Sequence, residues 1–420
     1  MMALHQAWQR QWRRNPRAVA LVDAGSGRRW TRDEVESEAR RWGDEQAVAA
    51  NRRLVCFSAA NGLAWWAAFL GALRSGRAAA AIDPAEPPEA ARELAARASR
   101  RLPPGTELVK LTSGSTGRPR ALAFTGEQML ADGRQIRATM GIHGNDTNLG
   151  LIPFGHSYGL GNLVLPLLAG GVPILCGVPP LPHGIAEAAV RHGATVFPAV
   201  PAVLRALADS DLDRRSLGAL RLVISAGAPL EPAVAERFFA RFGCRIHNFY
   251  GSSETGGIAF DRTGEATLTG RSAGRPLRGV RIAFEANGRF RVAGAAVMGA
   301  GAHRPADRAR PGARGELTLI GRTGRTIKIA GRRVDPAEIE AALRRLAPGA
   351  DCCVLPHPRR PDALAAVVAG PPPPPAGGWS ALLRPALAPW KIPRHWVTVA
   401  ALPVNGRGKI DRAAIAGLLG

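Results

Sequence analysis

The sequence predicts an α/β fold: a large domain with mostly parallel sheets and a β-subdomain, followed by a small α+β domain. Apolar strand-like runs alternate with helical patterns between residues 148 and 260, which is typical of parallel strands joined by helices. Short β-rich segments with glycine turns from about 265 to 320 predict the β-subdomain. The pattern changes again after Arg322, so we expect domains over residues 1–321 and 322–420.

The first elements follow from apolar periodicity and from turn residues. Residues 53–83 predict strand, helix and strand, and the apolar runs Glu107–Leu111 and Ala121–Phe124 predict two more strands. The pattern Thr125-x-x-Gln128 is typical of the capping box that opens a helix.

Later elements follow from the same signals. Apolar runs predict core strands at Val172–Leu175, Thr195–Phe197 and Leu220–Ile224. In the C-terminal domain, Pro336 suits the first position of a helix, which we expect to end near Leu346. Two apolar runs after this helix complete the α+β pattern.

Composition favours a reduced, cytoplasmic protein. The chain has 420 residues, 46% hydrophobic and 21% charged, which is ordinary for a globular protein with more than one domain. No apolar run approaches the roughly 20 residues that span a bilayer, and the first residues lack the apolar centre of a secretory signal. The five cysteines show no metal-ligand spacing, so we expect reduced, buried thiols and no membrane span.

The net charge of +23 comes from arginines scattered among alanines, glycines and prolines. A compositional bias of a GC-rich genome explains this pattern without a basic functional surface. The alternative is attraction to polyanions, namely ATP, CoA, an acidic carrier protein or nucleic acid. No zinc finger, aromatic RNA-binding signature or continuous basic helix is present, so no specific nucleic-acid partner is expected.

The segment between the two strands near residue 115 has the composition of a phosphate-binding loop. It reads Thr112, Ser113, Gly114, Ser115, Thr116, Gly117, and arginines follow at positions 118 and 120. Glycines allow a tight turn in which successive N–H groups point at one anion, and the hydroxyl groups add donors. The order is not that of a Walker A loop. A polar hairpin turn is the alternative.

This segment resembles the phosphate loop of the adenylate-forming superfamily, which contains acyl-CoA synthetases, peptide-synthetase adenylation domains and luciferase. Further segments match the family in its own order, and kinship explains that order better than chance. They are Ile224–Leu230, Asn248–Thr255, Gly315–Arg322, Ile327–Glu340 and Leu402–Arg412.

The resemblance implies that the protein uses ATP and Mg²⁺ to convert a carboxylic acid to an acyl-adenylate. The loop Thr112–Gly117 would hold the β- and γ-phosphates, and Glu254, helped by Thr116, would bind the magnesium ion. Further nucleotide contacts are implied at Gly227, Ala228, Pro229, Asn248, Tyr250, Gly251, Ser252, Ser253, Asp307 and Arg322. Of these, Asp307 would bind the ribose hydroxyls and Arg322 a ribose or phosphate group.

The resemblance places the catalytic lysine near the C-terminus. Lys409, on a glycine-flanked loop, would bridge the substrate carboxylate and the α-phosphate. The C-terminal domain would be a mobile lid that rotates after adenylation and brings Lys328 and Gly331 to the site. The acyl group would then pass to the thiol of CoA or of a carrier-protein phosphopantetheine.

The segment Pro153–Gly159 resembles that of acyl- and aryl-CoA ligases, and its histidine, His156, would orient the carboxylate. A structural histidine is the alternative. The apolar runs Leu160–Leu168 and Val196–Val200 could line the acyl pocket. No acidic residue is obviously placed to pair with the ammonium group of an amino acid, so a fatty or aromatic acid is favoured as substrate.

The chain also departs from the family pattern. The stretch before the phosphate loop is short, Arg120 stands where lysine is typical, and Gly324 stands where the family hinge has aspartate or lysine. These departures leave two alternatives open: a nucleotide-binding pseudoenzyme, and an adenylating enzyme with a non-thiol acceptor.

Overall fold

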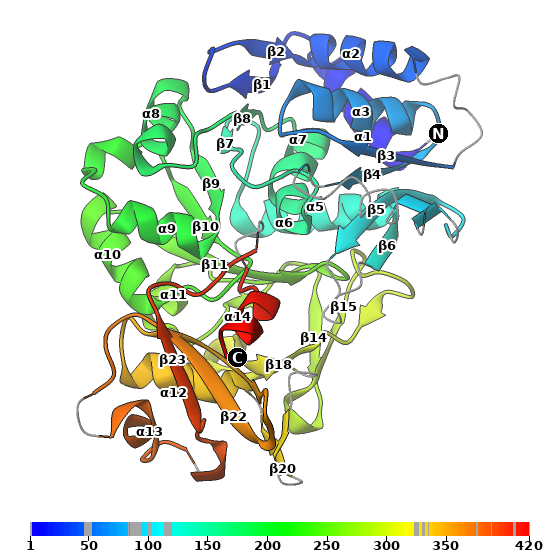
Figure 1. Ribbon diagram of the computed structural model, residues 1–420. Coiled ribbons are helices and arrows are strands. Elements are labelled where there is room, and N and C mark those ends of the chain that lie inside the picture. The colour runs from blue at the N-terminus through cyan, green and yellow to red at the C-terminus, as the bar shows by residue number, and fades with distance from the viewer. Residues whose placement is uncertain are drawn as a thin grey trace. The chain divides into compact units, whose positions relative to one another are not determined.

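The computed structural model describes most of the chain in two compact units (Figure 1). The described residues are 2–45, 53–82, 84, 95–96, 98–99, 102–112, 120–322, 327–329, 332–334, 336–374, 377–387, 389–405 and 409–419. The first unit consists of Met1–Ala283, Phe290–Pro305 and Pro311–Thr318. The second consists of Phe284–Arg289, Ala306–Arg310 and Leu319–Gly420.

The largest sheet of the first unit has nine strands, in the order β13-β12-β11-β10-β9-β7-β8-β1-β2. They are β1 (Val19–Asp23), β2 (Arg29–Thr31), β7 (Asn148–Leu149), β8 (Ile174–Cys176), β9 (Val196–Ala199), β10 (Leu222–Ser225), β11 (Ile246–Ser252), β12 (Gly256–Phe260) and β13 (Arg275–Pro276). Its six central strands, from β11 to β1, pair in parallel, and the strands at both edges are antiparallel. The predicted α/β class is confirmed.

Helices connect the parallel strands, as such connections require. The helix α8 (Pro182–His192) precedes β9, α9 (Pro201–Ala208) precedes β10, and α10 (Pro232–Phe242) precedes β11. Each begins with a proline, whose fixed φ suits the first helical position, where no intrahelical donor is needed. Their apolar faces pack in one buried cluster with the strands.

A second sheet contains the two strands that flank the predicted phosphate loop. It contains β3 (Leu54–Ser58), β4 (Ala78–Ile82), β5 (Thr106–Thr112) and β6 (Arg120–Thr125), with α3 (Leu63–Arg74) between β3 and β4. The strands β5 and β6 are antiparallel, and Thr112 pairs with Arg120. The loop therefore connects two hydrogen-bonded strand ends, while positions 113–117, the rest of the predicted loop, lie outside the described residues.

The predicted capping box is confirmed at the start of α5 (Gly126–Met140). The Gln128 N–H donates to Thr125 Oγ1 at 3.3 Å, and the Thr125 N–H donates to Gln128 Oε1 at 3.0 Å. These bonds satisfy two donors that a helix start otherwise leaves unpaired. They fix the direction in which the chain leaves β6.

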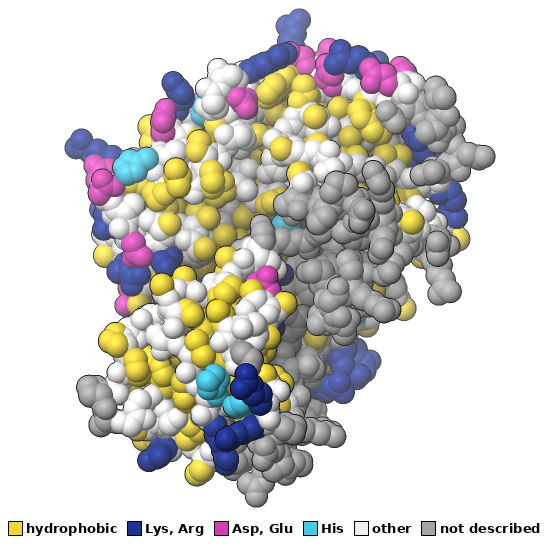
Figure 2. Space-filling model, in the orientation of Figure 1, with side chains coloured by type: hydrophobic (Ala, Val, Ile, Leu, Met, Phe, Trp, Pro, Cys, Tyr) yellow, Lys and Arg dark blue, Asp and Glu magenta, His cyan; other side chains and the backbone are white. Residues whose placement is uncertain are grey.

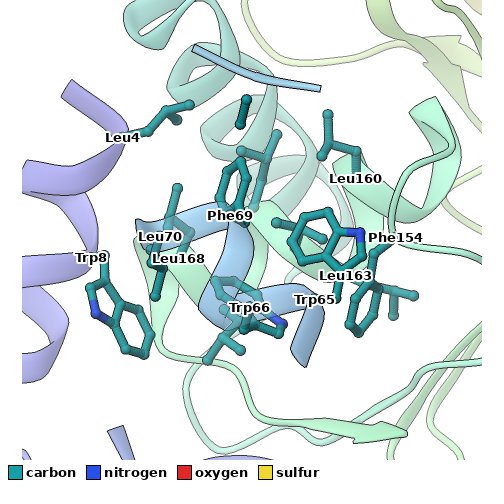
Figure 3. Close-up of a cluster of buried hydrophobic side chains, with 14 of the residues drawn as sticks. Leu4, Trp8, Trp65, Trp66, Phe69, Leu70, Phe154, Leu160, Leu163 and Leu168 are labelled. Atoms are coloured by element: carbon teal, nitrogen blue, oxygen red, sulfur yellow. The ribbon is translucent and has the colours of Figure 1, made fainter. Parts of the chain in front are cut away.

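An aromatic cluster forms the core beneath these elements (Figure 3). The Trp65 ring lies 4.9 Å from the Phe69 ring and 5.2 Å from the Phe154 ring. The segment after residue 159 continues as a π-helix, Leu160–Val164, and then as α7 (Leu165–Gly170). Figure 3 draws Leu160, Leu163 and Leu168 in this cluster, where all three are buried.

This packing corrects one expectation. The run Leu160–Leu168 packs into the protein core, so it is not free to line a pocket. The buried residues of Val196–Val200 also pack in the core, whereas Val200 is partly buried. A continuous apolar run has the same pattern in a core helix and in a pocket wall, so periodicity does not separate the two.

The short strands that were predicted as a β-subdomain are present. They are β14 (Arg281–Phe284), β15 (Phe290–Ala293), β16 (Ala302–His303), β17 (Asp307–Pro311) and β18 (Leu317–Arg322). They form one three-stranded sheet, β14-β15-β16, and one pair, β17-β18. A short helix, α11 (Glu265–Thr269), precedes them.

The second unit is α+β. Its main sheet pairs β21 (Asp351–His357) antiparallel to β22 (Arg360–Ala369), and β22 parallel to β23 (His395–Val399). One buried cluster joins this sheet to α12 (Pro336–Leu346) and α13 (Gly378–Leu383), and another joins it to α14 (Arg412–Leu418). The helix α12 has the predicted limits. A smaller hairpin pairs β19 (Ile327–Ile329) with β20 (Arg332–Val334).

In the described part of the chain, no helix combines the length and the apolar character needed to cross a bilayer.

Candidate active site

The carboxyl ends of three parallel strands of the large sheet meet at one edge. Ser225, the last residue of β10, pairs with Ala199 of β9 and with Asn248 of β11. The turn Gly227–Pro229 follows β10, and Tyr250 lies near the end of β11. Ligands of open α/β sheets bind at such edges. The residues predicted to contact adenine are thus brought to one edge of the sheet.

The turn from β11 to β12 carries Glu254 and is tied down at several points. The Ser252 and Thr255 hydroxyl groups lie 3.0 Å apart, and the Thr255 N–H donates to the Ser252 carbonyl at 3.3 Å. The Glu254 carbonyl accepts the Met298 N–H at 2.9 Å, and the Glu254 side chain is half-buried. Gly251 lies in β11 beside this turn. The turn is therefore an ordered platform for a carboxylate.

The segment with His156 contacts the same turn. The Ser157 hydroxyl donates to the Ser253 hydroxyl at 2.9 Å. His156 is half-buried, immediately precedes the short helix α6 (Ser157–Gly159), and donates its N–H to the Pro153 carbonyl at 3.1 Å. The structure thus places Ser157, the residue after His156, against the turn that carries Glu254.

Tyr158 anchors this segment to the sheet edge. Its hydroxyl donates to the Ile224 carbonyl at 3.0 Å and lies 3.3 Å from the Ala199 carbonyl. Burial raises the pKa of Tyr158 well above its ordinary value, so the hydroxyl stays protonated as a donor. The sequence interpretation gave Tyr158 no role. A tyrosine two residues after His156 in the matched motif was the available signal.

Sequence reasoning also missed Lys110, which lies in β5 just before the predicted phosphate loop. Its side chain is 3% exposed, and its ammonium donates to the Ser253 carbonyl at 3.4 Å. Burial lowers the pKa of Lys110, and the carboxylates of Asp132 and Glu254 act in the opposite direction. A lysine in a strand pattern is normally an exposed residue, so nothing in the pattern marked this one as buried.

The remaining predicted residues lie in the second unit and are placed within it alone. Asp307 begins β17 and is half-buried, and Arg322 ends β18. Lys328 pairs with Arg333 in the β19–β20 hairpin, and Gly331 lies outside the described residues.

Lys409 lies on an exposed loop of the second unit. Its N–H donates to Asn405 Oδ1 at 3.1 Å, and the Asn405 N–H donates to the Lys409 carbonyl at 2.7 Å. Val404 and Ile410 form a β-bridge on either side. The loop is therefore closed at its base, and this closure fixes the backbone from which the Lys409 side chain extends.

A magnesium ion fits the residues at the Glu254 turn. The described residues contain no group of three or more His, Cys, Asp or Glu side chains arranged to hold a metal. Magnesium is commonly held through one or two carboxylates together with substrate phosphates. A single half-buried carboxylate therefore suits an ion that arrives with a nucleotide, and Thr116, the second expected ligand, lies outside the described residues.

Solved structures with the same architecture define the class of fold. The chain superposes on ATP-bound MatB from Rhodopseudomonas palustris with a TM-score of 0.81 at 20% identity, covering 99% of both chains. It superposes on the O-succinylbenzoate coenzyme A synthetase of Bacillus subtilis in complex with AMP with a TM-score of 0.80 at 19% identity, covering 96% of both. The fold is that of adenylate-forming enzymes.

Sequence comparison identifies the family. The model of the family described as AMP-binding enzyme matches residues 108–295. A probable 2-succinylbenzoate–CoA ligase of Mycobacterium tuberculosis is 30% identical over 336 residues, covering 73% of this chain and 83% of the relative. The chain belongs to the AMP-binding enzyme family.

Another relative is longer than this chain. The benzoate–CoA ligase of Thauera aromatica is 27% identical over 337 residues, covering 72% of this chain. The match spans 64% of that relative's length.

Proposed function

We propose that the protein is an ATP-dependent acid–thiol ligase that forms an acyl-adenylate and then a thioester. The observation that carries the proposal is the convergence at the sheet edge. There the residues expected to contact adenine, the segment with His156 and the Glu254 turn lie together, and Lys110 joins that turn to β5, the strand before the predicted phosphate loop. Kinship with CoA ligases supports the same reaction.

In the first step, a carboxylate oxygen of the acid attacks the α-phosphorus of ATP, and pyrophosphate leaves. Both reactants are anionic, so catalysis requires that charge be neutralised and geometry fixed. The loop Thr112–Gly117 would hold the β- and γ-phosphates through N–H groups, and Glu254 would hold the magnesium ion. When bound, this ion would neutralise part of the phosphate charge. Lys409 would donate to the α-phosphate and the carboxylate.

The nucleoside would be contacted by the residues that the family resemblance assigns to adenine and to the ribose. Asn248, Tyr250 and the turn Gly227–Pro229 would contact adenine. Asp307 would contact the ribose, and Arg322 the ribose or a phosphate group. His156 would orient the carboxylate of the acid. Because Tyr158 is fixed through the Ile224 and Ala199 carbonyls, its hydrogen bonds would hold the His156 segment at the sheet edge.

In the second step, a thiolate attacks the acyl carbon of the adenylate, and AMP leaves. We place this step after a rotation of the C-terminal domain, residues 322–420, which would present Lys328 and Gly331. The second unit takes most of its residues from Leu319–Gly420, near the expected boundary, and also contains Phe284–Arg289 and Ala306–Arg310. The names of the relatives favour CoA as acceptor over a carrier protein.

A basic depression in the second unit also fits an anionic acceptor such as CoA. It has a volume of about 480 Å³, and its lining residues are His357, Arg359, Arg360, Arg394, His395 and Leu419. Figure 2 shows histidine and basic side chains gathered on this unit. Guanidinium groups bind phosphate through paired hydrogen bonds, so CoA phosphates suit this surface.

The packing of the leucines and the names of the relatives favour an aromatic acid over a fatty acid. The leucines expected to line a long pocket are packed in the core, which removes one wall for an extended chain. Relatives of this chain are named for benzoate, ferulate and 2-succinylbenzoate. The expected setting of the reaction is the cytoplasm, where ATP and CoA are available.

The proposal is tested by pyrophosphate release with ATP and Mg²⁺ across aromatic, fatty and amino acids, with and without CoA. We expect release with one class of acid, aromatic acids first, and more turnover with CoA. Release without any thioester would indicate a non-thiol acceptor. If no acid on the panel causes pyrophosphate release while ATP still binds, the result would contradict the proposal and indicate a pseudoenzyme. Arg120 and Gly324, which depart from the family pattern, are the residues that favour this alternative.

A further inference from the structure

Lys110 and Asp132 are two buried ionisable residues that the proposed reaction does not use. Lys110 is 3% exposed and Asp132 is 2% exposed. Removing two such charges from water is costly, and apolar residues of similar size are often at least as stable in their place. Stability alone therefore gives little reason for a lysine and an aspartate at these positions.

The ammonium of Lys110 is directed at the Glu254 turn. It lies 4.3 Å from the centre of the Phe124 ring and 3.4 Å from the Ser253 carbonyl oxygen. Among the described residues, this carbonyl is its one hydrogen-bond acceptor within 3.5 Å. The two nearby carboxylates belong to Asp132 and Glu254, and both favour the charged form of the lysine.

Asp132, in α5, holds the other end of the same turn. Its Oδ1 accepts the Gly257 N–H at 2.9 Å. Gly256 has a φ of +71°, and a Cβ atom there would collide with the Asp132 carboxylate. The carboxylate thus lies directly against the backbone, where only glycine leaves room for it.

The side chains of Lys110 and Asp132 therefore bind the turn on both sides of Glu254. Lys110 binds a carbonyl one residue before Glu254, and Asp132 binds an N–H three residues after it. Lys110 comes from the strand that enters the phosphate loop, and Asp132 comes from the helix that follows β6. The pair thus fixes the turn to the elements on both sides of the loop.

We propose that Lys110 and Asp132 are positioning residues that hold the Glu254 turn at a fixed place relative to β5 and α5 before nucleotide binds. The expected effect on the rate of adenylation rests on the proposed function. The expected order of the Glu254 turn in the free protein does not. In this view Glu254 meets the metal and phosphates in a set geometry, which lowers the barrier of the adenylation step.

The direct test is hydrogen–deuterium exchange of the free protein, with the double variant K110M/D132N. The paired change removes both buried ionisable groups, and the neutral asparagine oxygen accepts the Gly257 N–H more weakly than the carboxylate does. We expect exchange at Thr255, Gly257 and Met298 to accelerate by about tenfold, with the melting temperature changed by less than about 3 °C. Unchanged exchange would overturn the proposal.

A matched control is K391M. Lys391 lies in the second unit and binds the exposed Glu338 carboxylate at 2.6 Å, so the same substitution there removes a surface ion pair. We expect wild-type exchange at the Glu254 turn in this variant. If the double variant does not fold, D132N alone keeps the lysine, and acceleration is then expected at Gly257. Wild-type exchange at Gly257 in D132N would contradict the proposal.

Kinetics separate positioning from general damage. In K110M/D132N, we expect kcat for pyrophosphate release to fall by about 10- to 100-fold, while KM for ATP changes by less than about threefold. A rise in KM with unchanged kcat would contradict positioning for the reaction. If the wild-type protein itself releases no pyrophosphate, the proposed function fails, and the exchange experiment still decides the order of the turn.

Discussion

At the residue scale, the site depends on a few polar side chains that the fold brings together from distant segments. Ser157 and Ser253, 96 positions apart in the chain, share a hydrogen bond of 2.9 Å. Tyr158 reaches the ends of two strands through carbonyl groups. Spacing along the chain gives no signal for such contacts, because each depends on how helices and strands pack.

Lys409 provides the first residue-scale prediction. We expect Lys409→Ala to lower acid-dependent pyrophosphate release by about 100- to 1,000-fold, because the variant loses the cation that stabilises charge in the transition state. ATP affinity, measured by calorimetry, should change little. Normal adenylate formation by the variant would remove Lys409 from the proposed mechanism.

The basic depression of the second unit provides the second residue-scale prediction. Changing Arg359, Arg360 and Arg394 together to glutamine should raise KM for CoA by about tenfold or more, because phosphate loses charge-assisted hydrogen bonds. Pyrophosphate release without CoA should stay at the wild-type rate. Arg237→Gln, at an exposed ion pair with Asp209, is the control and should leave KM for CoA unchanged. An unaltered KM in the triple variant would exclude this surface from acceptor binding.

At the element scale, local chemistry fixes where helices and strands begin, and packing decides what they do. The capping box at Thr125 and the proline at the start of α12 were predictable, because each satisfies a requirement of its own helix. The role of Leu160–Leu168 was not, because a buried helix and a pocket wall have the same apolar pattern. The burial of Lys110 depends on Phe124, Asp132 and Ser253, which are distant in sequence.

Asp146, which lies just before β7, provides an element-scale prediction about the pH dependence of stability. Burial alone would raise the pKa of Asp146, but hydrogen bonds from Arg221, the His143 N–H and Thr195 outweigh it and hold the pKa below its ordinary value. A lowered pKa in the folded state stabilises the fold above the unfolded-state pKa of about 4, and this contribution is lost as pH falls through the folded-state pKa.

We therefore expect Asp146→Asn to lower the free energy of unfolding at pH 7 by about 2 kcal/mol, with the difference from wild type shrinking toward pH 3. Denaturant unfolding at several pH values measures this. Asp209→Asn is the control, because the Asp209–Arg237 pair is exposed and should contribute less than about 1 kcal/mol. A difference that grew as pH fell would contradict the assignment.

At the scale of the whole molecule, the order of motifs predicted the family, the α/β class and the α+β character of the second unit. Each motif is short and is formed by residues that are close together in the chain, so it can be recognised in a single sequence. The proposed rotation of the C-terminal domain is not among these properties, because motif order contains no information about movement of one unit against the other.

The two-step use of the C-terminal domain makes a whole-molecule prediction. Gly331→Trp should keep acid-dependent pyrophosphate release near the wild-type rate and reduce thioester formation by at least about 100-fold, because the ring would block the path of the pantetheine arm. Parallel assays of pyrophosphate and thioester measure the two halves. Equal losses in both, or in neither, would argue against a rotating domain.

The measurement that tests the central claim most directly follows oxygen from the acid to the nucleotide. The favoured acid, labelled with ¹⁸O in its carboxylate, is incubated with ATP, Mg²⁺ and CoA, and the AMP is analysed by mass spectrometry. If the carboxylate attacks the α-phosphorus and CoA then displaces AMP, each AMP carries one ¹⁸O atom per turnover. Thioester formation with unlabelled AMP, or with ADP and labelled phosphate as products, would contradict an acyl-adenylate mechanism.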